Sequence, residues 1–161
     1  MGDLVPQKLL CLISPLLPQR DSFRGQFLPQ ATQKSIQILD QYTEPFFMVV
    51  EGGQIDWGGH ENETNYIISE LLDFDKAIEV AYQYAKEQSN TLVIVTADHE
   101  TGGFSINDGA YKENKLTGAF TSTYHTATMV PVFAFGPGAA HFQGVMDNTE
   151  IFFKIKQLME L

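Results

Sequence analysis

Carboxylate and imidazole side chains at the ends of apolar runs are the residues of this sequence best suited to chemistry. Six such residues stand out: Glu51, Asp56, His60, Asp98, His99 and His125. The apolar runs read as strands, and in open α/β sheets ligands bind beyond the carboxyl ends of the strands. Imidazole nitrogen and carboxylate oxygen are ligands that zinc favours, and a catalytic zinc site has three protein ligands and an open position. The residue types therefore favour a metal site.

The spacing suggests one complete set of zinc ligands. Asp56 and His60 are four residues apart. On a helical turn this spacing places both side chains on the same face. His125 could complete a set of one carboxylate and two imidazoles.

The other three candidates belong to shorter patterns. Asp98 and His99 are adjacent, and a sharp turn after a strand could aim both at a second ion. Glu51, at the tip of a strand, offers the hard oxygen ligand that suits magnesium. Each pattern taken singly has an ordinary explanation, because aspartate often caps a helix and a single histidine is more often a surface residue. Only the joint placement of the six is informative.

Composition limits the classes of partner. A chain of 161 residues can bury one ordinary core, so one domain is expected. The formal charge of −10 argues against nucleic acid as a specific partner and against an anionic membrane, since both require basic patches. Cys11 is the only cysteine, which excludes an intrachain disulfide and a cysteine-rich zinc site. The apolar run at 9–17 is too short to span a membrane, and no signal peptide is visible.

The elements that must position the six residues alternate between strands and helices. Strands are predicted at 8–14, 46–50, 91–96 and 131–135, and helices at 31–42, 63–88 and 149–161. This order is typical of an α/β fold with a parallel sheet and helices on its faces. Residues 15–30 are expected to form a loop in which Arg20 and Arg24 are solvated. Residues 103–128 are expected to form an irregular excursion outside the sheet.

Three segments together resemble the alkaline phosphatase family. The family's E-G-x-x-I-D-x-x-x-H segment stands here as residues 51–60, and its T-A-D-H-E-T-G-G segment stands as residues 96–103. Its late H-T pair stands as His125-Thr126. The resemblance covers roughly 8–161 and implies that 1–161 is the C-terminal part of a single alkaline-phosphatase-like domain. The implied fold is a three-layer α/β structure with a mainly parallel sheet, truncated at the N-terminus.

The resemblance also implies the metals and the reaction. A full-length parent would bind two zinc ions and one magnesium ion and hydrolyse phosphate monoesters, releasing inorganic phosphate. In the family, the two zinc ions clamp the attacking and leaving oxygens. By resemblance, Asp56, His60 and His125 are the ligands of the first zinc ion. Asp98 and His99 are two ligands of the second zinc ion, and Glu51 is one ligand of the magnesium ion. A homodimer is the expected assembly, and the periplasm or the extracellular space is the expected location of the parent.

The family's serine nucleophile has no counterpart in this sequence. It lies in an Asp-Ser-Ala motif upstream of the Glu51 segment, whereas the one Asp-Ser pair here, Asp21-Ser22, is followed by Phe23 and is expected to be a turn. No catalytic residue is therefore assigned within the chain. At most one well-formed zinc site is expected, and the chain alone should turn over phosphomonoesters poorly or not at all.

Two other functions stay open, and three smaller expectations follow. The chain could be a non-catalytic zinc-binding fragment or module, or a phosphodiesterase-type relative of the same superfamily, although Glu51 disfavours the relative. Trp57 is expected at the edge of the metal cluster and His141 at the surface. A core cut from a larger sheet exposes an edge and an apolar face, so self-association or marginal stability is expected.

Overall fold

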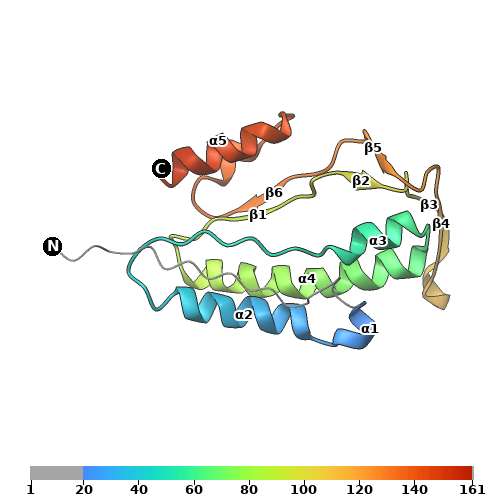
Figure 1. The fold of residues 1–161 in the computed structure, drawn as a ribbon, viewed down its shortest axis with the longest axis horizontal. Coiled ribbons are helices and arrows are strands. Elements are labelled where there is room, and N and C mark those ends of the chain that lie inside the picture. The colour runs from blue at the N-terminus through green and yellow to red at the C-terminus, as the bar shows by residue number, and fades with distance from the viewer. Residues whose placement is uncertain (1–19, 161) are drawn as a thin grey trace.

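Figure 1 shows the fold in a computed structural model, which describes residues 20–160. The helices are α1 (Asp21–Arg24), α2 (Phe27–Leu39), α3 (Gln54–His60), α4 (Thr64–Glu87) and α5 (Asn148–Leu158), with short 3-10 helices η1 (Tyr111–Glu113) and η2 (Ala139–Phe142). The strands are β1 (Val93–Val95), β2 (Glu100–Thr101), β3 (Ser105–Ala110), β4 (Lys115–Ala119), β5 (His125–Thr126) and β6 (Phe133–Phe135). The predicted strand at 8–14, with Cys11, lies outside the described residues.

The long helix α4 organises the fold. Both α2 and α3 pack against it, and Figure 1 shows α2 running alongside it. Its residues Ile67, Ala77 and Ala85 are buried, whereas Leu71 and Leu72 are more than half exposed. The helix therefore carries most of the packing that supports α3.

The described strands pair as three two-stranded antiparallel sheets: β1 with β6, β2 with β5, and β3 with β4. The mixture of helices and strands agrees with an α/β class, and β1 and β6 fall inside the predicted strands at 91–96 and 131–135. Their antiparallel pairing departs from the predicted parallel sheet. Parallel neighbours need a crossover connection, usually a helix, but no α-helix lies between β1 and β6. The chain therefore returns in the opposite direction.

Residues 46–50 are extended, but they pair with no strand in the described part of the chain. Phe47 and Val49 are exposed, whereas their neighbours are half-buried. The ring of Phe46 lies 6.4 Å from that of Tyr84, so this segment runs along α4. A strand in a sheet with helices on its faces was predicted here, but the described residues cover only one side of this segment.

The predicted loop at 15–30 is wrong where the structure describes it, because it contains α1 and the start of α2. Pro29 is the third residue of α2. Proline is tolerated there, because the first backbone N–H groups of a helix have no intrahelical partner. Asp21 and Ser22 are accordingly helical residues rather than a turn.

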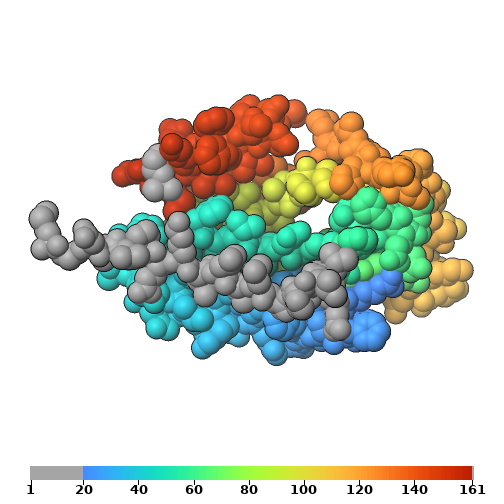
Figure 2. All heavy atoms as spheres, viewed as in Figure 1, coloured from blue at the N-terminus to red at the C-terminus, as the bar shows by residue number. Residues whose placement is uncertain are grey.

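The C-terminal helix begins at Asn148, one residue before the predicted start at 149. Asp147 caps α5 by accepting from the backbone N–H of Thr149, and Glu150 completes a capping box. Figure 2 shows the C-terminal residues (red) at the opposite edge of the molecule from α1 and α2 (blue). Of the helices that the structure describes, none is both long and apolar enough to cross a membrane.

Candidate metal centre

Helix α3 presents Asp56 and His60 together. They lie one turn apart, and Nε2 of His60 is 3.4 Å from Oδ2 of Asp56. The helical turn expected from their spacing is therefore present. Gly58 between them is buried, and a Cβ there would lie 2.9 Å from the backbone nitrogen of Ile67 on α4. The absence of a side chain at Gly58 lets the helix that carries these two candidates pack directly on α4.

Strand β5 brings His125 to the same place. Its Nε2 is 3.5 Å from Oδ1 of Asp56, and one ligand atom from each of Asp56, His60 and His125 lies within 4.8 Å of the others. A tetrahedral zinc ion with bonds of about 2.0–2.1 Å holds neighbouring ligand atoms about 3.4 Å apart. His60 lies at about that spacing from Oδ2 of Asp56 and His125 lies at about that spacing from Oδ1, so one imidazole faces each carboxylate oxygen. One carboxylate and two imidazoles this close together are a donor set of the type that zinc binds.

The ring of His60 is oriented by a backbone contact. Its Nδ1 lies 2.7 Å from the carbonyl oxygen of Thr123. A carbonyl oxygen only accepts, so Nδ1 carries the proton, and in the neutral ring Nε2 keeps its lone pair. Metal-binding histidines commonly have such a partner on the other ring nitrogen. Trp57 lies beside this ring, with centroids 6.2 Å apart, at the exposed edge of the cluster as expected.

Asp98 and His99 lie beside this set. The ring of His99 stacks on that of His125, with centroids 3.5 Å apart. The Thr101 hydroxyl donates to Oδ1 of Asp56 at 2.5 Å and lies 3.2 Å from Nδ1 of His99. The Asp98 side chain is 87% exposed, and its Oδ2 is 3.3 Å from Nε2 of His99. Within the described residues, these two side chains are adjacent to the three-residue group but do not form a second one.

Glu51 is not part of the three-residue group. It is exposed and follows the extended residues 46–50. A Cβ on Gly53 would lie 2.9 Å from Oε1 of Glu51, so the Glu51 carboxylate lies close to Gly53, just before the start of α3. Among the described residues, no hydrogen bond or ion pair joins Glu51 to the other five candidates.

Sequence reasoning missed the role of Glu100. Its carboxylate accepts from the backbone N–H groups of Gly103 at 3.1 Å and Phe104 at 3.0 Å, and from the Thr126 hydroxyl. Burial acts to raise the pKa of Glu100, but these hydrogen bonds outweigh it and lower the pKa below its ordinary value. Glu100 thereby ties β2 to the strand that carries His125. The sequence signal for this role is the glycine pair at 102–103, because both glycines have positive φ and turn the chain so that the next N–H groups face the Glu100 carboxylate.

The described residues line a cavity of about 630 Å³. Asp98 and His99 line one part of it, and residues 126–132 and 142–146 line much of the rest. Asp56, His60 and His125 are not among its lining residues. The space therefore adjoins Asp98 and His99, two of the three candidates outside the group, and is not lined by Glu51.

Known proteins resemble this chain in both sequence and fold. The family model for alkaline phosphatase matches residues 18–118. Alkaline phosphatase 4 of Bacillus subtilis is 32% identical, in an alignment that covers 84% of this chain and 44% of that protein. The structure of alkaline phosphatase from the Antarctic bacterium TAB5 superposes with a TM-score of 0.82 and 46% identity, covering 89% of this chain and 44% of that one.

A variant of the TAB5 enzyme is similar to this chain and contains a metal. It was solved with magnesium bound in a site named M3, and it matches with a TM-score of 0.81 and 44% identity, again over 89% of this chain and 44% of its own. The chain therefore spans about 44% of the length of these relatives. The family model covers more than half of the chain, and the chain belongs to the alkaline phosphatase family.

Proposed function

We propose that this chain forms the zinc-binding part of a phosphate monoesterase, with Asp56, His60 and His125 holding one zinc ion. The observation that carries the proposal is the meeting of one carboxylate and two imidazoles from α3 and β5, with one imidazole nitrogen 3.4 or 3.5 Å from each oxygen of Asp56. Membership of the alkaline phosphatase family supports the reaction class, since relatives bear that name.

The other candidates extend the proposal to two further ions. Asp98 and His99 would supply two ligands of a second zinc ion, and Glu51 one ligand of a magnesium ion. The remaining ligands and the nucleophile would come from residues outside 1–161. When bound, such ions supply the positive charge that stabilises the attacking and leaving oxygens in phosphoryl transfer. An acidic protein needs this local charge to handle an anionic substrate.

Residues of this chain would hold the ligands ready before an ion binds. The Thr101 hydroxyl donates to Asp56, and the Thr123 carbonyl fixes the ring of His60. Glu100 holds the strand that carries His125 through its hydrogen bond from Thr126. Preorganised ligands lose less freedom on binding, which favours tight binding.

The wider proposal concerns the whole protein. Residues 1–161 would be the C-terminal part of a single three-layer domain, with 103–128 outside its sheet. The substrates would be phosphate monoesters, the product inorganic phosphate, the assembly a homodimer, and the location the periplasm or the extracellular space. Exposed apolar side chains on 46–50 and on β6 support an assembly in which these surfaces are covered.

A zinc titration tests the site. Trp57 is the only tryptophan and lies against His60, so its fluorescence should report binding to the metal-free chain. We expect about one zinc per chain by elemental analysis, lost in His125→Ala. The control is His141→Ala, because His141 is exposed on η2 and is outside the cluster. No zinc in the unaltered chain, or full binding by His125→Ala, would overturn the proposal.

A turnover assay tests whether the chain alone can catalyse hydrolysis. The zinc-loaded chain alone should hydrolyse p-nitrophenyl phosphate no faster than buffer, because its sequence contains no Asp-Ser-Ala nucleophile motif. An enzyme-like rate that disappears in Asp98→Ala would contradict this expectation and show that the chain carries its own nucleophile.

A further inference from the structure

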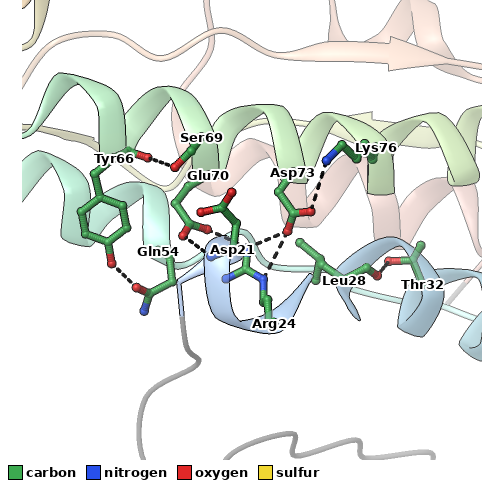
Figure 3. Close-up of polar contacts among 10 residues, drawn as sticks. All are labelled: Asp21, Arg24, Leu28, Thr32, Gln54, Tyr66, Ser69, Glu70, Asp73 and Lys76. Carbon is green, nitrogen blue, oxygen red and sulfur yellow. Dashed lines mark hydrogen bonds and ion pairs between the residues drawn. The ribbon is translucent and has the colours of Figure 1, made fainter. Parts of the chain in front are cut away.

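A second polar network touches α3 away from the metal ligands (Figure 3). Gln54 is the first residue of α3, is only 5% exposed, and accepts a hydrogen bond from the Tyr66 hydroxyl of α4. Tyr66 is also buried. Leaving a buried donor or acceptor unpaired costs about 1–3 kcal/mol, so this pair holds the start of α3 firmly.

Arg20 reaches groups at both ends of the same helix. Its guanidinium carbon lies 3.6 Å from the centroid of the Tyr66 ring, a cation–π contact on the residue that holds Gln54. Its Nη2 donates to Oε2 of Glu61 at 2.5 Å. Glu61 directly follows His60 and caps the end of α3. One side chain therefore connects the beginning and the end of the helix that carries two zinc-ligand candidates.

The neighbours of Arg20 fix it to α4. Arg24 donates from Nη2 to Oε2 of Glu70 at 2.6 Å and to Oδ2 of Asp73 at 2.7 Å. The backbone N–H of Asp21 donates to Oε1 of Glu70 at 2.7 Å. Both carboxylates are about 1% exposed, and Figure 3 shows them pointing from α4 toward α1. Exposed ion pairs contribute little on their own, but here the backbone beside Arg20 is anchored by buried ones.

A helix as short as α3 cannot hold its own shape. It has seven residues, and isolated helices below about 12–15 residues are marginal in water. The orientation of Asp56 and His60 is therefore set by what α3 contacts. Gly58 fixes how closely α3 approaches α4, and the network of Arg20, Tyr66 and Gln54 fixes its ends.

We propose that Arg20, Tyr66 and Gln54 are positioning residues that clamp α3 in the orientation in which Asp56 and His60 bind zinc. The inference rests on the proposed zinc site and adds residues that are not ligands to it. Outer partners of metal ligands typically change metal affinity 10–100-fold when they are removed. Because this clamp acts through the helix rather than on a ligand directly, we expect a loss of zinc affinity of about 10-fold.

A matched pair of tyrosine variants tests the clamp. The Tyr66 hydroxyl donates to Gln54, and that of Tyr84, on the same helix, donates to Oδ1 of Asp40 at 2.6 Å. The two tyrosines are about 27 Å apart at 1.5 Å per residue. Tyr66→Phe should lower zinc affinity about 10-fold in the Trp57 fluorescence titration, whereas Tyr84→Phe should leave it unchanged. Each variant removes one hydroxyl, but the Tyr66 pair is buried and the Tyr84 pair is exposed. Zinc affinities are therefore compared only after far-UV circular dichroism shows that both variants are folded.

Arg20→Ala gives a second test, with folding checked by far-UV circular dichroism. It removes both the cation–π contact and the pair with Glu61, and we expect a loss of zinc affinity at least as large as in Tyr66→Phe. Should this variant fail to fold, Tyr66→Phe decides alone. Folded Tyr66→Phe that binds zinc as tightly as the unaltered chain would overturn the clamp only. Absence of zinc binding by the unaltered chain would overturn the proposed function and the clamp with it.

Discussion

Arg24→Ala would remove the guanidinium group that pairs with the buried carboxylates of Glu70 and Asp73. Burial opposes the charged form of Arg24, but its hydrogen bonds to Asp73 and Glu70 outweigh burial and raise the pKa of Arg24 above its ordinary value. Removing one partner of a buried pair costs about 3–5 kcal/mol, because uncompensated charge stays behind. The Arg24 side chain is 12% exposed, and Nζ of Lys76 remains 3.9 Å from Oδ1 of Asp73. We therefore expect the lower end, about 3 kcal/mol.

Urea unfolding followed by far-UV circular dichroism measures this loss. With a slope of about 2 kcal/mol per molar urea, 3 kcal/mol lowers the midpoint by about 1.5 M. A triple variant, Arg24→Met with Glu70→Leu and Asp73→Leu, removes the charges together and should recover most of the stability, since apolar replacement of a whole buried cluster is often neutral or better. A midpoint shift below about 0.5 M in Arg24→Ala would refute the reasoning.

Three further outcomes are expected. Gly59→Ala should abolish zinc binding in the fluorescence titration, because a Cβ there would lie 2.8 Å from the Thr101 carbonyl oxygen and would push α3 from β2; unchanged affinity would contradict this packing. The Thr149 hydroxyl and N–H lower the pKa of Asp147, so its contribution to α5 is present near neutrality and lost as pH falls through that lowered pKa. The helical circular dichroism signal should therefore fall less on acidification in Asp147→Ala than in the unaltered chain. Parallel pH curves for the two proteins would count against the cap. Sedimentation velocity should show self-association through exposed apolar residues, and a stable monomer would disprove it.

Helix α4 could be predicted from the sequence because its own pattern determines it. Apolar residues at helical spacing predicted 63–88, and the helix spans Thr64–Glu87. Asp56 and His60 could be paired for the same reason, since a spacing of four fixes their common face. The spacing of nearby residues was therefore enough to predict the part of the site that lies on α3.

Elements that depend on distant partners could not be predicted in the same way. Whether residues 46–50 pair as a strand depends on a neighbour that their own residues do not specify. Pro29 suggested a loop, because nothing in the neighbouring sequence indicated that this proline lies in the first turn of a helix, where proline is tolerated. Burial of Arg24 depended on Glu70 and Asp73, which lie more than 40 residues away along the chain. The antiparallel direction of β6 likewise followed from the path of the intervening chain.

The candidate zinc group joins two distant parts of the chain, α3 with Asp56 and His60 and β5 with His125, and this separation would link metal binding to folding. His60 and His125 are about 65 residues apart. Closing a loop of that length in a disordered chain costs about 4 kcal/mol of entropy, from the logarithmic dependence on loop length. An ion held by all three residues would therefore be bound by the folded chain far more strongly than by the unfolded one. Bound zinc would therefore stabilise the folded chain, and a chelator added to the zinc-loaded protein should lower its melting temperature.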